Sequence, residues 1–156
     1  MRLAAASLLA LLFLTGSGCM PGADGISERT VLGYLDARFG NSQIFPNEIH
    51  LYFSTATPQS NRAYLGGTWT VEKERAVLGE AGGTIVYRFR AAQVNLVMGA
   101  PAPIRMRVRL NGTLIAEDII RDKDLYTLLT QTDYEEGVVE IEFLDPGVEV
   151  YAFTFS

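Results

Sequence analysis

Apolar and polar residues alternate over much of this chain with a period of two, which is the spacing of a β-strand buried on one face. The clearest case is residues 104–110, where four apolar side chains alternate with three arginines. Asn111 and Gly112 follow directly. Both residue types tolerate a positive φ, so this pair predicts a two-residue hairpin turn into a returning strand at 113–116.

Similar alternation predicts further strands, at residues 84–90, 93–98, 139–143 and 148–155, with two less regular candidates at 69–73 and 75–78. In the last strand, Tyr151, Phe153 and Phe155 are expected to share one face. Residues 125–129 fit either a strand or one helical turn, and a strand is favoured. The best helical candidate is 30–39, although Gly33 weakens it. About eight to ten short strands separated by turn residues predict an all-β fold, an antiparallel β-sandwich.

The first nineteen residues have the pattern of an export signal. Arg2 precedes an apolar run of about 12 residues, which is too short to span a hydrocarbon core of about 30 Å. Small residues then lead to Cys19, the only cysteine in the chain. We expect a lipoprotein signal peptide at 1–18 and an acylated Cys19 inserted in membrane lipid. Ordinary secretion, with Cys19 as a free thiol, is the alternative.

Export predicts an extracytoplasmic protein. Acylation of Cys19 would anchor it to a membrane on the periplasmic face, and in a Gram-negative cell this is expected to be the outer membrane. Pro21 and Gly22 indicate a flexible tether at 19–29, followed by a single domain at 30–156. Removing residues 1–18 leaves 138 residues, enough to bury a core without disulfides. The formal net charge is −5. Because phosphate binding needs a clustered positive field, no nucleic-acid partner is expected.

Several short motifs spread over residues 28–156 are similar to those of one known family. They are residues 28–37, Tyr64-Leu65-Gly66-Gly67-Thr68-Trp69, Val108-x-Leu110-Asn111-Gly112, Asp124-Leu125-Tyr126-x-Leu128 and the ending Asp145-Pro146-Gly147-Val148-x-x-Tyr151-Ala152-Phe153-Thr154-Phe155. Together they resemble the C-terminal domain that accompanies thioredoxin-like domains in DipZ-type membrane proteins of thiol–disulfide and cytochrome c biogenesis, here as a stand-alone lipoprotein without the thioredoxin domain.

This resemblance implies a jelly-roll, galactose-binding-like β-sandwich of the carbohydrate-binding-module type, a non-catalytic module with glycan binding as one role. The redox chemistry of the family belongs to a separate thioredoxin domain with a Cys-x-x-Cys motif. This chain has one cysteine. None of that redox activity is therefore expected here.

Residue types that support catalysis or metal binding are sparse. Nucleophilic catalysis needs a base beside the nucleophile, and the only histidine, His50, lies in a strand-like segment typical of a structural residue. Zinc needs three or four His or Cys ligands. Asp122 and Asp124 are candidates for a structural calcium site, with a solvated loop as the favoured interpretation. Neither enzymatic activity nor a cofactor is expected.

Aromatic side chains are the first group of ligand-binding candidates, because sugar rings stack on exposed aromatic rings. The candidates are Trp69, Tyr64, Tyr126 and Tyr134. Trp69 alternates with Val71 and is expected in the core. Tyr134 stands in a polar segment and is expected to be exposed.

A basic stripe formed by Arg105, Arg107 and Arg109 is the second group. It predicts a surface for an anionic glycan, a lipid head group or a partner protein. The favoured alternative is cross-strand ion pairing with Glu140 and Glu142.

Two functional hypotheses follow from these observations. The first is a non-catalytic, lipid-anchored, extracytoplasmic module that binds carbohydrate or a cell-envelope glycan. The second is a protein-interaction module that docks on a periplasmic thioredoxin-like protein of a DipZ-type thiol–disulfide system. Exposed aromatics on a concave sheet would favour the first hypothesis, and a flat apolar patch would favour the second.

Overall fold

The computed structural model describes residues 25–36 and 38–156, so the expected signal peptide and Cys19 lie outside the described residues. The elements are β1 (Thr30–Val31), the short 3-10 helix η1 (Tyr34–Asp36), β2 (Ile49–Tyr52), β3 (Ala63–Val71), β4 (Ala76–Leu78), β5 (Gly83–Gly99), β6 (Ile104–Leu110), β7 (Thr113–Ile120), β8 (Asp124–Phe143) and β9 (Glu149–Phe155). Named strands pair only in the antiparallel sense within the described part. The predicted all-β, jelly-roll-like antiparallel sandwich is confirmed. In the part of the chain that the structure describes, no helix is long and apolar enough to cross a membrane.

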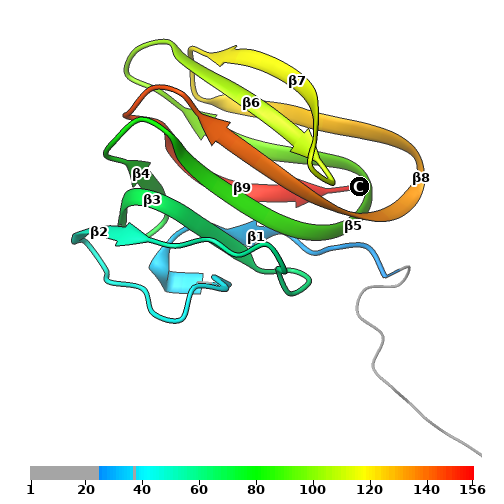
Figure 1. Ribbon diagram of the computed structural model, residues 1–156, viewed down its shortest axis with the longest axis horizontal. Coiled ribbons are helices and arrows are strands. Elements are labelled where there is room, and N and C mark those ends of the chain that lie inside the picture. Colours follow the sequence, from blue (N-terminus) through cyan, green and yellow to red (C-terminus); the bar gives the residue numbers. More distant parts are fainter. Residues whose placement is uncertain (1–24, 37) are drawn as a thin grey trace, which may run out of the picture.

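Two long strands, β5 and β8, connect the layers of the sandwich. The first half of β5 pairs with residues 135–143 of β8, and its second half pairs with residues 124–130. A register shift between Ala91 and Gln93 marks the place where the paired strands bend (Figure 1). Such bulges kink a strand locally. The sequence predicted two separate strands for β5 because the shift interrupts the alternation of apolar residues.

One layer contains β2, β3, β6 and β7 together with the first half of β5 and the second half of β8. The other layer contains β1 and β9 with the remaining halves of β5 and β8. The short strand β4 pairs with both β3 and β9 and so joins the two layers. The two sheets are therefore connected at two places, by β4 and by the bend of β5 and β8.

The core lies between the layers and is built from the faces that the alternation predicted. Ile104, Met106 and Val108 of β6 are buried, whereas Arg105 on the opposite face is exposed. The corresponding buried side chains of β5, β8 and β9 include Ile85, Tyr87, Phe89, Leu96, Val139, Ile141, Phe143, Val150 and Phe153. Burial of this set supplies the main driving force for folding.

The predicted hairpin and the favoured strand at 125–129 are both confirmed. Asn111 and Gly112 have φ values of 51° and 85° and join β6 to β7. The Asn111 side-chain oxygen also accepts a hydrogen bond from the Val138 backbone N–H at 2.9 Å, which ties the turn to β8. Residues 125–129 lie within β8.

The helical expectation for residues 30–39 is wrong. This segment forms β1 and η1 instead, and the intervening Leu32 is fully buried. A Cβ added at Gly33 would lie 2.4 Å from the Glu74 Cα, so only glycine lets this segment pack against the β3–β4 turn. A long helix would lose this contact and the pairing of β1 with β9.

The described end of the expected tether packs on the domain. The Ser27 backbone N–H donates to the Arg90 carbonyl at 2.9 Å, and the Arg90 N–H donates to the Ser27 hydroxyl at 2.9 Å. Ser27 is buried and Ile26 packs against the core. The packed part of the chain thus begins before Thr30.

Candidate functional site

A β-bulge in β9 turns Tyr151 away from the core. Ala152 pairs with Val97 and Val150 pairs with Met98, so Tyr151 is an extra residue in this strand. Val150 and Phe153 are both fully buried although they are three positions apart. The expectation that Tyr151 shares a face with Phe153 and Phe155 is therefore wrong. Bulges are known to redirect side chains in this way.

Tyr151 borders a surface hollow of about 420 Å³, called the Tyr151 hollow below. Its lining residues are Arg29, Val31, Leu35, Asp36, Lys73, Glu74, Val97, Lys123, Tyr151 and Ala152. They come from the segment before β1, from β1, η1, the β3–β4 turn, β5, the β7–β8 turn and β9. Segments far apart in the sequence thus meet at one place because the sandwich brings them together.

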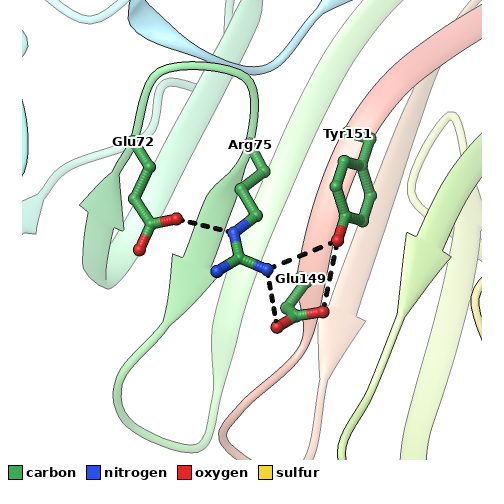
Figure 2. A network of polar contacts seen from close by, with 4 residues as sticks. All are labelled: Glu72, Arg75, Glu149 and Tyr151. Carbon is green, nitrogen blue, oxygen red and sulfur yellow. Dashed lines mark hydrogen bonds and ion pairs between the residues drawn. The ribbon is translucent and has the colours of Figure 1, made fainter.

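The Tyr151 hydroxyl belongs to a network of polar contacts centred on Arg75 (Figure 2). The Arg75 Nε donates to Glu72 Oε2 at 2.6 Å, and its Nη1 donates to Glu149 Oε1 at 2.8 Å and to the Tyr151 hydroxyl at 3.4 Å. The Tyr151 hydroxyl in turn donates to Glu149 Oε2 at 3.3 Å. Hydrogen bonds from Arg75 to Glu72 and Tyr151 raise the pKa of its guanidinium above the usual value. The ring position of Tyr151 is therefore set in advance of any ligand.

Lys123 lies over the Tyr151 ring, with its Nζ 3.9 Å from the ring centroid. A cation over an aromatic face is attracted by the ring quadrupole. Lys123 itself is exposed, in the turn between β7 and β8. The hollow thus combines an aromatic ring, a cation above it and the apolar residues Val31, Val97 and Ala152.

Two of the four aromatic candidates from the sequence are buried and cannot stack on a ligand. Trp69 has 0% exposure, and its Nε1 donates to the Gly66 carbonyl at 2.9 Å. Tyr64 is 8% exposed, and its hydroxyl accepts a hydrogen bond from the Gln59 backbone N–H. Trp69 lies on the core face of β3, whereas Tyr64 lies on the other face, where the segment around Gly40 covers its ring. The expectation that Trp69 and Tyr64 bind a ligand is therefore wrong.

The other two aromatic candidates do not line the Tyr151 hollow. The Tyr126 hydroxyl donates to the Asp122 carbonyl at 2.7 Å and so closes the β7–β8 turn. Tyr134 is 49% exposed, as expected, in the part of β8 near the bend. The structure brings none of the four predicted aromatics together.

The arginine stripe forms ion pairs across neighbouring strands. Arg105 makes a bidentate contact with Asp145, at 3.0 Å from Nε and 2.8 Å from Nη2. Arg107 contacts Glu117 at 2.9 Å. Arg109 lies 3.1 Å from Glu142 and 3.6 Å from Glu140. The favoured pairing with Glu140 and Glu142 is thus found for Arg109 and, at 3.9 Å from Glu142, for Arg107, whereas Arg105 pairs with Asp145 instead.

A second hollow, of about 580 Å³, lies beside this stripe and includes Arg105, Arg107 and Glu117. It is larger than the Tyr151 hollow, but its lining contains no aromatic side chain and its two paired arginines already have acidic partners. The Tyr151 hollow therefore has the better combination of apolar and polar surface for a small ligand.

Residues considered for catalysis and metal binding stay apart. Over 25–36 and 38–156, no group of three or more His, Cys, Asp or Glu side chains converges on a metal position. Asp124 instead accepts a hydrogen bond from the Leu125 backbone N–H at 2.7 Å, and Asp122 offers its backbone carbonyl to Tyr126. The His50 ring stacks on Phe45 with 4.0 Å between centroids.

The side chains that form the hollow were missed by sequence reasoning. For Tyr151, the sequence predicted a face shared with Phe153 and Phe155, because the bulge is not visible in the sequence of β9 alone. Arg29, Lys73 and Lys123 stand in turns or linkers, and nothing in their local sequence indicates that they meet.

Comparison with known proteins gave a family and a fold. The family described as thioredoxin like C-terminal domain matches residues 27–156. A family two carbohydrate esterase from Cellvibrio japonicus superposes with a TM-score of 0.52 at 13% identity, over 58% of this chain and 29% of the esterase. CsCBM6-3 from Clostridium stercorarium, solved in complex with cellobiose, has a TM-score of 0.40 at 19% identity, over 77% of this chain and 95% of that one.

The esterase from Clostridium thermocellum, in complex with cellohexaose, gives a TM-score of 0.49 at 9% identity over 53% of this chain and 27% of its own length. This chain thus spans less than a third of the length of either esterase. A comparison with curated protein sequences gave no match. At these identities the structural similarity concerns the fold alone.

Proposed function

We propose that this chain, which belongs to the thioredoxin-like C-terminal domain family, is an extracytoplasmic binding module for carbohydrate and that the Tyr151 hollow is its site. The observation that supports this most strongly is the outward-facing Tyr151 ring, fixed by Arg75 and Glu149 at the border of a hollow of about 420 Å³. Small-ligand sites combine apolar or aromatic surface with a few well-placed polar groups. The hollow has both.

A sugar ring matches this combination in shape and polarity. Its C–H face packs on apolar or aromatic side chains, here Val97, Ala152 and Tyr151, while its hydroxyls need donors and acceptors. Asp36 and Glu74 can accept such hydrogen bonds at the rim. The Cellvibrio japonicus protein that shares the fold is named a carbohydrate esterase, which makes carbohydrate the first ligand class to test.

We propose that the module does not catalyse a reaction. A nucleophilic mechanism needs a nucleophile with an adjacent base. The lining residues of the hollow include no serine, threonine, cysteine or histidine. Binding without turnover is the simplest use of this set of side chains.

We propose further that acylated Cys19 anchors the module to a membrane. About six peptide units separate Cys19 from Gly25, so they can span at most about 22 Å. Arg29, which lines the hollow, follows shortly after Gly25. Such an anchor would keep the binding site close to the bilayer surface.

A protein-docking role is the second candidate, and strand β2 supports it. Ile49 and Leu51 of this strand and Phe53, which follows its end, are 76%, 52% and 78% exposed and alternate along the chain. Among the named strands of the described chain, β2 pairs with β3 alone, so its other edge carries no further strand. Residues 49–53 include no Lys or Pro, the usual protection of an edge. An extended segment of a thioredoxin-like protein could add to this edge as a further strand.

Titration calorimetry of residues 25–156 with a panel of oligosaccharides tests the first proposal. Tyr151→Ala should weaken binding by about 2 kcal/mol, roughly thirtyfold, because a partly buried ring contact is lost. Tyr151→Phe retains the ring and should lose less. Phe53→Ser changes an exposed aromatic outside the hollow and should leave carbohydrate binding unchanged.

The same variants separate the two candidates. Unchanged carbohydrate binding by Tyr151→Ala would place the site elsewhere. If no saccharide binds, and Phe53→Ser but not Tyr151→Ala abolishes binding of a purified thioredoxin-like protein, docking replaces carbohydrate binding as the function.

A further inference from the structure

Three cations line the Tyr151 hollow, and each comes from a different segment. Arg29 precedes β1, Lys73 lies in the β3–β4 turn, and Lys123 lies in the β7–β8 turn. All three are exposed. With Asp36 and Glu74 in the same lining, the formal charge of the hollow is +1 (three cations less two carboxylates), against −5 for the whole chain, so the hollow is locally positive on an acidic protein.

These cations differ from most arginines of the molecule in their ion pairing. Within the described residues, Arg29, Lys73 and Lys123 have no carboxylate oxygen within 4.0 Å. In contrast, six arginines are paired with acidic side chains: Arg38, Arg75, Arg88, Arg105, Arg107 and Arg109. The basic stripe on β6 is thus neutralised by its neighbours. Six cations of the described residues lie outside these ion pairs, and three of them line the Tyr151 hollow, whereas Arg62, Arg90 and Arg121 do not.

We infer that the ligand of the Tyr151 hollow is an acidic carbohydrate, a sugar that bears a carboxylate or sulfate group. This inference rests on the proposed function and specifies its substrate class. The Lys123 ammonium covers one face of the Tyr151 ring, 3.9 Å from its centroid, so a sugar that packs beside this ring on Val97 and Ala152 lies next to the ammonium. An anionic substituent on that sugar then meets Lys123, with Arg29 and Lys73 at the same rim.

The rest of the lining is consistent with such a ligand. Val31, Val97 and Ala152 supply apolar contact for the sugar ring. Asp36 and Glu74 also line the hollow, so the three cations face two carboxylates. The carboxylates repel the anionic substituent but accept hydrogen bonds from hydroxyls, which fixes the orientation of the sugar with its acidic group toward Lys123.

A matched pair of ligands tests the inference: oligogalacturonate and its methyl ester, which have the same ring but differ in charge. Sulfated and unsulfated galactan oligosaccharides form a second pair. Calorimetry on residues 25–156 should show at least about tenfold tighter binding of the acidic member, because a charge-assisted hydrogen bond is gained. The difference should shrink as salt is raised from about 0.01 to 0.5 M, since screening weakens exposed charges.

Lys123→Gln should remove most of this preference, with about a tenfold loss for the acidic ligand and little change for the neutral one. Arg121→Gln is the control. Arg121 is an exposed cation of the same β7–β8 connection, but it lines the other hollow, beside Arg105 and Arg107. The Arg121→Gln substitution changes the net charge as much as Lys123→Gln does, and it should leave the affinities for the acidic and the neutral ligand unchanged.

The outcomes distinguish this inference from the proposed function. Equal affinity for acidic and neutral members, or equal effects of Lys123→Gln and Arg121→Gln, overturns the inference while carbohydrate binding stands. Failure of every acidic and neutral saccharide to bind overturns the proposed function, and the inference with it.

Discussion

At the scale of single residues, Asp145 shows how one side chain fixes the junction of two strands. Its carboxylate accepts hydrogen bonds from the Arg105 backbone N–H at 2.9 Å and from two atoms of the Arg105 guanidinium. These bonds lower the pKa of Asp145 from 3.8 to about 2. The turn that precedes β9 is thereby tied to the beginning of β6.

This lowered pKa predicts a pH dependence of stability. A carboxylate with a lower pKa in the folded than in the unfolded chain stabilises the fold above the unfolded value, and the stabilisation is lost as the pH falls through the folded value. Urea unfolding should therefore show the wild type losing stability between pH 3.8 and about 2, whereas Asp145→Asn has a flatter profile in that window. The effect is small because the pair is exposed. Parallel pH profiles of the two proteins would contradict it.

Residue positions on regular strands were predictable, whereas Tyr151 was not. Burial of Trp69 followed from its alternation with Val71, and both are fully buried. In β9 the alternation is interrupted by the bulge at Tyr151, where the register with β5 changes by one residue. A bulge depends on how two strands fit each other, so the sequence of one strand does not show it.

At the scale of secondary-structure elements, β6 is the strand that the sequence specifies best. Three of its apolar residues are buried, and its arginines lie on the polar face, paired with β7, β8 and the turn before β9. A shift of one residue would exchange the two faces completely. The two faces can therefore be tested against each other by substitution.

Val108→Asp should cost about 3–5 kcal/mol in the free energy of unfolding, because it places an unpaired charge at a fully buried position. Arg107→Ala removes exposed pairs with Glu117 and Glu142 and should change stability by less than about 0.5 kcal/mol. Chemical denaturation of both variants gives the comparison. A larger loss for Arg107→Ala would mean that the assigned faces are reversed.

The secondary structure differs from the prediction at places where tertiary contacts decide the local structure. In 30–39, the apolar residues permitted a helix, but Gly33 packs on Glu74 and β1 adds to β9 instead. In β5 and β8, the bend between layers preserves pairing along both strands, so four expected segments became two long strands. Such outcomes depend on the whole sandwich rather than on local preference.

At the scale of the whole molecule, the fold class was predictable and the binding site was not. Strand periodicity was enough to indicate an antiparallel sandwich. The Tyr151 hollow, however, is assembled from residues as distant in sequence as Arg29 and Tyr151, together with Lys73 and Lys123. Their proximity results from strand order, in which β9 lies between β1 and β4. Strand order cannot be derived from alternation alone.

The most direct test of the account is a map of the ligand contact on the folded domain. Backbone amide shifts of residues 25–156 should be followed by NMR during titration with the tightest saccharide found in the calorimetric panel. The account predicts that the largest shifts occur at Arg29, Lys73, Lys123 and Tyr151, around one hollow. Shifts confined to β2 and Phe53, or to the arginine face of β6, would contradict the assignment of the Tyr151 hollow as the binding site.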